Sequence, residues 1–205
     1  MPPTAACSRR AGNAWSNRMK FVPVISWCMH AIRKVLASRS SVPDPHETAM
    51  IKPCLWFNGK AEEAASFYVS VFPDASIGSV SRYGAGAPFP EGTAIMVEFE
   101  LQGQRFQALN GGAQFTHSPA VSLSVDAKDS AEVDYYWNAL IAGGGKEGRC
   151  GWLTDRFGVS WQVVPDGLGR VLSDPDPARR GRAMQALMQM TKLDLDALRA
   201  AAHGP

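Results

Sequence analysis

The 205-residue sequence has no paired cysteine motif and no marked excess of charge of one sign. Its four cysteines, Cys7, Cys28, Cys54 and Cys150, lie far apart, which argues against a structural zinc site and against a disulfide scaffold. The formal net charge is only +2, from 21 basic and 19 acidic residues, so we expect no basic surface that gathers nucleic acid. These absences favour reduced thiols, a cytoplasmic location and no nucleic-acid partner.

Long apolar runs are also missing. The longest candidate, residues 21–32, is interrupted by Pro23, Ser26 and His30. It falls well short of the roughly 20 apolar residues that a membrane-spanning helix needs. We therefore expect no membrane partner.

Residues 1–49 differ in composition from the rest of the chain, with seven Lys or Arg against two acidic residues. A basic start followed by a modest apolar stretch is similar to a targeting sequence, but no small-x-small cleavage site follows. A translated upstream extension is the alternative, because Met50 immediately precedes the first strand pattern. We interpret residues 1–49 as a basic, poorly ordered extension and assign it no function.

What the sequence does contain is two similar series of strand and helix patterns, within a globular composition of 45% apolar and 20% charged residues. Apolar periodicity predicts a strand, a helix and three strands in the first half, and the same order in the second half. Residues 166–205 are predicted to be a helical tail, with Asp194 beginning its last helix. In the first half the predicted strands are 52–57, 77–83, 93–101 and 105–110, and the predicted helix is 61–72. In the second half the predicted strands are 120–126, 148–153 and 159–164, and the predicted helix follows Asp129 or Ser130.

Several short motifs carry a family resemblance. They are Pro-Cys-Leu-Trp-Phe-Asn-Gly at 53–59, Ala-Leu-Asn-Gly-Gly at 108–112, Cys-Gly-Trp at 150–152 and Asp-Arg-Phe-Gly-Val-Ser-Trp-Gln at 155–162. Over residues 50–165 the chain resembles the PhnB-like branch of the vicinal oxygen chelate, or glyoxalase/bleomycin resistance, superfamily. The resemblance implies an α+β fold in which two βαβββ modules form curved mixed sheets around a shared cavity, commonly in a homodimer.

Members of this branch are often labelled 3-demethylubiquinone-9 3-methyltransferase, and the sequence offers a test of that label. A site for S-adenosylmethionine usually has a glycine-rich turn that opens a helix. The nearest match, Gly84-Ala85-Gly86, is followed by Pro88 and Pro90, which indicates a loop between strands. We therefore regard a methyltransferase as less favoured.

The resemblance also implies four positions at which related enzymes hold a divalent metal through His, Glu or Gln. In this chain they fall at or near Pro53, at Ala120, at Gln162, and near Gln107 or Asn110. Pro and Ala cannot bind metal, and two neutral amides are too weak to hold a transition metal. We expect a cavity without metal or other cofactor.

Strand alternation predicts which side chains reach that cavity. Val121, Leu123 and Val125 are expected to face the helix, and Trp56 and Trp161 are expected in the core. Tyr83 and Trp152 are less determined and are candidates for stacking on a ligand. The predicted binding residues are Leu55, Phe57, Tyr83, Met96, Asn110, Ser122, Ser124, Trp152 and Gln162.

Four further residues have two interpretations each. Cys150, with Arg149 and Arg156 nearby in sequence, is either a reactive thiol or a small residue at a strand start. Asp155 and Arg156 fit a β-turn better than a catalytic role. His117 is either a mobile imidazole at the site or a solvated loop residue.

The favoured function is a metal-independent protein that binds an unidentified small molecule. The alternative is a metal-dependent lyase, isomerase or dioxygenase of the same superfamily. A scaffold that binds no ligand is the third possibility.

Overall fold

The computed structural model describes residues 50–204, so the predicted extension at 1–49 lies outside the described residues. The first module contains β1 (Cys54–Phe57), α2 (Ala61–Val71), β2 (Ala75–Arg82), β3 (Ala94–Leu101) and β4 (Gln104–Asn110). The second contains β5 (Ser122–Ala127), α3 (Ser130–Ile141), β6 (Lys146–Glu147), β7 (Trp152–Thr154) and β8 (Ser160–Pro165). The duplicated β-α-β-β-β order is confirmed, although none of the predicted strand ranges covers the short β6.

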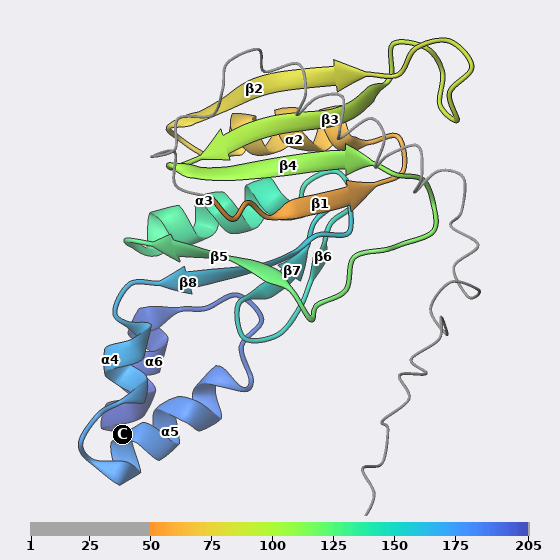
Figure 1. Ribbon diagram of the computed structural model, residues 1–205. Helices are drawn as coiled ribbons and strands as arrows, with labels where there is room; N and C mark the ends of the chain where they lie inside the picture. Colours follow the sequence, from red (N-terminus) through yellow and green to blue (C-terminus); the bar gives the residue numbers. More distant parts are fainter. Residues whose placement is uncertain (1–49, 205) are drawn as a thin grey trace, which may run out of the picture. The chain divides into compact units, whose positions relative to one another are not determined.

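Each module forms one mixed sheet of four strands (Figure 1). Sheet A has the order β1-β4-β3-β2 and sheet B has the order β5-β8-β7-β6. In both, the first and last strands of the module pair in parallel and the other neighbours are antiparallel. The α+β class with two modules is therefore confirmed, and the face of each sheet opposite its helix is called its outer face below.

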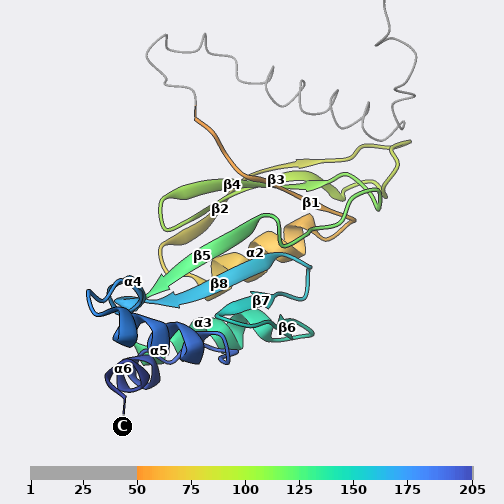
Figure 2. The same cartoon turned by 90° about the horizontal axis from the view of Figure 1, so that it is seen from below.

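The hydrophobic core lies on the helix-covered faces of the sheets and is shared by both modules. The helix α2 packs on sheet A and also reaches the strands of sheet B (Figure 2). Phe72, which follows α2, stacks on Trp161 of β8 and on Tyr136 of α3, with ring centroids 5.4 and 5.3 Å apart. Large aromatic pairs of this kind contribute more than their buried area alone. The two modules are thus joined by a single apolar cluster.

A buried carboxylate strengthens this junction. Asp155, only 3% exposed, follows β7 and accepts hydrogen bonds from the Tyr68 hydroxyl at 2.8 Å and from the Trp161 indole nitrogen at 2.9 Å. Its other oxygen accepts the backbone N–H groups of Phe157 and Val159. Burial and the neighbouring carboxylate together raise the pKa of Tyr68 well above its ordinary value, so the hydroxyl keeps its proton and remains a donor.

The tail consists of α4 (Leu168–Leu172), α5 (Pro177–Leu187) and α6 (Leu195–His203). Asp194 caps α6 by accepting from the backbone N–H of Ala197, as the sequence indicates. The short helix α4 is absent from the sequence prediction. The tail packs against module 2 at the start of β7 (Figure 1).

That contact explains why the predicted strand at 148–153 is shorter than expected. The backbone N–H groups of Cys150 and Gly151 donate to the carbonyl groups of Met190 and Thr191 in the tail. Both residues have positive φ angles, 57° and 83°, and a Cβ atom on Gly151 would lie 2.9 Å from the Leu193 side chain. Residues 148–151 therefore form a turn, and β7 begins only at Trp152.

Candidate functional site

The outer face of sheet B brings together most of the polar residues that the sequence assigned to a ligand site. In the register of three adjacent strands, Ser124 of β5 lies beside Gln162 of β8, and Gln162 lies opposite Trp152 of β7. Ser122 is two residues before Ser124 and so occupies the same face. The alternation predicted for β5 is thus observed within the strand, with Val125 and Leu123 toward the core and Ser124 exposed. The prediction that Val121 faces the helix is wrong, because Val121 precedes β5 and is 74% exposed.

One hydrogen bond between these side chains fixes the amide group of Gln162. The Gln162 Nε2 atom donates to the Ser122 hydroxyl at 2.8 Å. An amide can both donate and accept, so this bond leaves the carbonyl oxygen of Gln162 as an acceptor. The side chains of Ser122, Gln162 and Trp152 are half-buried, which is the exposure expected of groups that line a recess or an interface.

Two further polar residues, Ser160 and Thr154, belong to the same face and were missed from sequence. Ser160 pairs with both Ser122 and Thr154 in the register of β5, β8 and β7. It is only 4% exposed, although it is polar. The signal that could have found it is simple, because Ser160 has the same strand parity as Gln162. The face therefore carries two parallel rows of neutral polar side chains, with Trp152 at one end of the second row. Lys146 of β6, opposite Thr154, and Asp126, two residues after Ser124, lie at the borders of the same face.

The strand β1 does not follow the predicted alternation. Leu55 and Phe57 belong to the hydrophobic core, whereas Trp56 faces the opposite side and is only half-buried. The Trp56 indole nitrogen donates to the Gly112 carbonyl at 2.8 Å, and a Cβ atom on Gly111 would come within 2.1 Å of the ring. Leu55 and Phe57 therefore lie on the helix-covered face of sheet A, although Phe57 also lines a cavity described below. The core position predicted for Trp56 is wrong.

Asn110 and Tyr83 are engaged inside module 1. The Asn110 side chain, 1% exposed, accepts from the backbone N–H of Ala61 at 3.0 Å and donates to the Ala94 carbonyl at 2.9 Å. Tyr83 is 2% exposed and donates its hydroxyl hydrogen to the Asn110 carbonyl at 2.7 Å. Buried polar groups need such partners, and here the partners are structural. Neither side chain lies on the predicted ligand face.

Met96 does lie on the outer face of sheet A, beside Leu109 of β4. On the same face Glu98 accepts hydrogen bonds from Ser79 at 2.8 Å and from Lys52 at 3.1 Å. Burial would raise the pKa of Glu98, but these hydrogen bonds and a longer one from Gln107 outweigh it and lower the pKa. Glu98 is therefore an ionised, satisfied carboxylate.

The positions that the family resemblance assigns to metal ligands do not form a suitable donor set. Pro53 and Ala120 carry no donor atom, Gln162 bonds to Ser122, and Gln107 bonds to Glu98. Across residues 50–204 no group of three or more His, Cys, Asp or Glu side chains is arranged to hold a metal ion. A transition metal needs imidazole, thiolate or carboxylate ligands, so the residues present do not fit one.

Cys150 occupies a turn and not a catalytic constellation. Its thiol is half-buried and contacts the Leu187 carbonyl at 3.5 Å. Arg149 donates to the Met188 carbonyl, and the Arg156 guanidinium lies 3.9 Å from Glu63. The two arginines that are near Cys150 in sequence therefore interact with the Met188 carbonyl and with Glu63, and not with the thiol.

His117 is less solvated than a loop residue was expected to be. It lies in the segment 111–121 that leads from β4 to β5, with its ring 5.2 Å from that of Phe57. Its Nε2 atom is buried and has no hydrogen-bond partner among the described residues. Burial lowers the pKa of His117, against smaller opposing effects of Asp155 and the Trp56 backbone, so the imidazole is neutral at pH 7.

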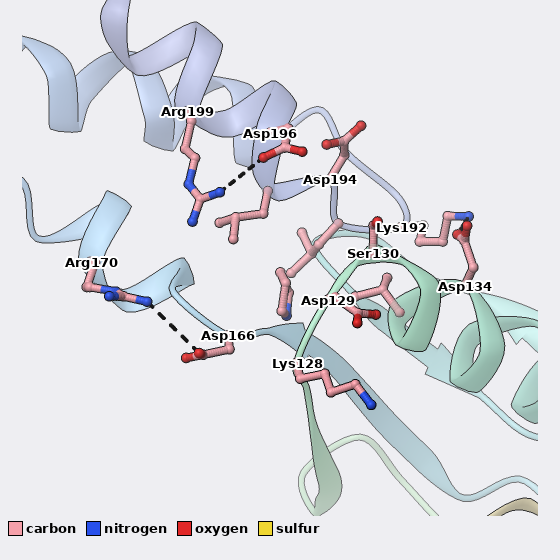
Figure 3. Close-up of a pocket in the computed structure, with 14 residues that line it drawn as sticks. Lys128, Asp129, Ser130, Asp134, Asp166, Arg170, Lys192, Asp194, Asp196 and Arg199 are labelled. Atoms are coloured by element: carbon pink, nitrogen blue, oxygen red, sulfur yellow. Dashed lines mark hydrogen bonds and ion pairs between the residues drawn. The ribbon is translucent and has the colours of Figure 1, made fainter.

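A cavity of about 660 Å³ lies between module 2 and the tail (Figure 3). Its lining is strongly charged, but each charged side chain already has a partner within the protein. Lys192 of the tail pairs with Asp134 of α3, and Asp129 and Asp194 cap helices. The remaining pairs are Arg170 with Asp166, Arg199 with Asp196, and Lys128 with Glu132. We interpret this cavity as the border of a structural contact.

The family model of 3-demethylubiquinone-9 3-methyltransferase matches residues 49–164, which is more than half of the chain. The chain belongs to this family. Its resemblance to the PhnB-like branch of the glyoxalase/bleomycin resistance superfamily is thereby confirmed. No curated protein matches the chain.

The chain is also similar to several solved structures. A putative 3-demethylubiquinone-9 3-methyltransferase, PhnB protein, from Bacillus cereus is 37% identical, with a TM-score of 0.54, and the match covers 57% of this chain and 99% of that one. A protein from Staphylococcus aureus is 30% identical, with a TM-score of 0.27 and coverage of 58% and 99%. Protein PA1353 from Pseudomonas aeruginosa is 24% identical, with a TM-score of 0.48 and coverage of 58% and 98%.

None of the helices within residues 50–204 combines the length and apolar character needed to cross a membrane.

Proposed function

We propose that this PhnB-like protein binds a small organic molecule on the outer face of sheet B without the help of a metal ion. The observation that carries the proposal is the pair of neutral polar rows, Ser122 with Ser160 and Ser124 with Gln162, next to the indole of Trp152. Ligand sites typically combine an apolar or aromatic surface with a few fixed polar groups. The Gln162–Ser122 hydrogen bond holds one such group in place.

The chemistry of this face indicates the kind of ligand. Hydroxyl and amide groups recognise neutral hydroxyl, carbonyl or ring-nitrogen groups, and the Trp152 indole offers a surface for stacking. The four side chains of the two rows are neutral, and the ionisable residues of this face, Lys146 and Asp126, lie at its borders. We therefore expect an aromatic or heterocyclic molecule whose neutral polar groups bond to the two rows and whose ring stacks on Trp152.

Two other functions have less support. A metal-dependent lyase, isomerase or dioxygenase needs ligands that Pro53 and Ala120 cannot supply. A methyltransferase that uses S-adenosylmethionine needs a glycine-rich turn leading into a helix, whereas Gly84-Ala85-Gly86 lies in the loop between the strands β2 and β3.

We further propose that a second copy of the chain covers this face, and that the protein acts in the cytoplasm. Half-buried residues such as Trp152 and Gln162 would then line a recess shared by two subunits. Analytical ultracentrifugation measures the predicted homodimer directly, and a monomer at all concentrations would contradict it.

Thermal-shift screening of a library of neutral aromatic and heterocyclic compounds tests the binding proposal. We expect ligands that raise the melting temperature equally with and without a chelator, because binding to the folded state stabilises it. Gln162→Leu should abolish the shift, whereas Gln185→Leu, on the exposed face of α5, makes the same chemical change and should preserve it. Ligands that stabilise the protein only when metal is present would overturn the proposal.

A further inference from the structure

A second cavity, of about 490 Å³, lies away from the two polar rows of sheet B. Both modules contribute to it, because it is bounded by the end of β1 and start of α2, by the turn between β7 and β8, and by the segment from β4 to β5 (Figure 1). Its lining combines aromatic and charged side chains. We call it the junction cavity, and its lining residues include Trp56, Phe115, His117, Lys60, Glu63 and Arg156.

The guanidinium of Arg156 is the main polar group of the junction cavity. Its central carbon lies 4.4 Å from the ring centre of Phe67 and 4.8 Å from that of Phe157, so two rings support the same cation. Glu63 approaches it at 3.9 Å, which is an ion pair but not a hydrogen bond. Among the described residues nothing accepts a hydrogen bond from this guanidinium, and about a third of the side chain is exposed.

An arginine held in this way is suited to bind an anion. The planar guanidinium has five N–H donors in a fork that matches a carboxylate, and stacking restricts its orientation before a ligand arrives. A preoriented group loses less conformational entropy on binding.

The balance of charge in the junction cavity also favours an anion. A hydrogen bond from Lys60 at 2.7 Å lowers the pKa of Glu63, so Glu63 is ionised and balances one of the two cations. His117 is neutral at pH 7 because burial lowers its pKa. Lys60 and Arg156 therefore leave the cavity with one net positive charge.

Trp56 and Phe115 give the junction cavity a wall that is suited to an aromatic ring. Trp56 and Phe115 meet edge to face with their ring centroids 5.1 Å apart, and Phe115 is 56% exposed. A large exposed aromatic side chain beside a cation is a common feature of sites for flat organic anions. The Trp56 indole N–H is already bonded to Gly112, so this wall offers ring surfaces and not a donor.

We propose that the junction cavity binds a small aromatic carboxylate, with the carboxylate on the Arg156 guanidinium and the ring against Trp56 and Phe115. This site is separate from the neutral ligand face of sheet B and does not depend on the function proposed for that face. The cavity lining does not include the residues of that face, which are Ser122, Ser124, Trp152, Ser160 and Gln162.

Titration of the full chain with benzoate, followed by two-dimensional amide NMR spectra, tests this site. We expect saturable shifts centred on His117, Phe157 and Gly158, which line the cavity. Arg156→Gln should weaken benzoate binding by about tenfold or more, because it removes a charged hydrogen-bonding partner. Arg156→Lys should weaken it less, since the charge remains but the fork is lost.

The controls separate this site from surface charge and from the sheet B face. Arg179→Gln removes an exposed arginine that also has one acidic neighbour, at 3.6 Å, and should leave benzoate affinity unchanged. Gln162→Leu should also leave it unchanged. Acetate and benzyl alcohol, which each lack half of the ligand, should bind at least about tenfold more weakly. The proposal is wrong if benzoate gives no saturable shifts, if Arg156→Gln binds it normally, or if acetate binds equally well.

Discussion

The two modules share one order of elements but secure the start of their helices in different ways. In module 2, Asp129 caps α3 by accepting from the backbone N–H of Glu132 at 2.9 Å, and Glu132 in turn accepts from the backbone of Lys128. In module 1, Lys60 precedes α2 and provides no side-chain cap. Asn110, at the end of β4, supplies the acceptor instead, because its side-chain oxygen accepts a hydrogen bond from the backbone N–H of Ala61.

This difference shows that one structural requirement has a local and a distant solution. The first N–H groups of any helix lack partners within the helix and need an acceptor from elsewhere. A local cap forms with the helix itself, whereas the Asn110 cap forms only when β4 is in place beside β1. We therefore expect changes to the distant contacts of this protein to cost more stability than changes to the local ones.

The largest effect is expected at Asp155, which joins the modules. Asp155→Ala should lower the free energy of unfolding by about 4 kcal/mol, because four donors, three of them buried, lose their acceptor. Urea denaturation measures the change. Tyr68→Phe removes only one of these bonds and should cost about 1.5 kcal/mol. Equal losses for the two variants would show that the shared carboxylate is not the main contact.

Asn110→Ala should have the next largest effect. It leaves the buried N–H of Ala61 and the carbonyl of Ala94 without their partners, and we expect a loss of about 3 kcal/mol. Urea denaturation again provides the measurement. Gln104→Ala, at the exposed start of the same strand, is the matched control and should change stability by less than about 0.5 kcal/mol.

Asp129→Ala tests the local cap of module 2 and should cost about 1 kcal/mol, because the capped N–H is exposed and water can replace the lost acceptor. Asp129→Ser keeps an acceptor at this position and should recover most of the loss. If Asp129→Ala destabilised the protein as much as Asn110→Ala, the distinction between local and distant caps would fail.

The smallest expected effect concerns pH and His117. Because the pKa of His117 is lower in the folded protein, the unfolded chain takes up more protons between that pKa and about 6.5. The contribution of His117 to stability is therefore complete above about pH 6.5 and is lost as the pH falls toward the folded pKa. Denaturation between about pH 7.5 and about pH 5.5 measures it. His117→Phe should have a shallower decline than the unmodified protein over this range.

The same contrast explains how much of the structure the sequence reveals. In β5, serine alternates with apolar residues, so one face is polar and the prediction for Ser122, Ser124 and Val125 agrees with the structure. In β1 the residues are Cys-Leu-Trp-Phe, without alternation of polarity. A strand that is apolar throughout gives no indication of which face is buried, and a shift of one residue exchanges the two faces.

The site was predictable to the extent that it depends on local pattern. The sequence predicted that Gln162 and Ser124 share one face, because polar and apolar residues alternate in both strands, and the register of β5 and β8 agrees. Asn110 was assigned to the cavity because it is polar, yet it is buried as the cap of a helix that begins 49 residues earlier. The junction cavity depends on Arg156 resting on Phe67 of the other module, and no periodicity in the sequence records that contact.

The hydrogen bonds from Cys150 and Gly151 to Met190 and Thr191 also bear on how the protein folds during translation. The acceptors are translated some forty residues after the donors, so the donors leave the exit tunnel well before their partners do. The cap that Asn110 provides for α2 is complete once β4 has been made. The turn at Cys150 acquires its final hydrogen bonds only after residues 190 and 191 have been made.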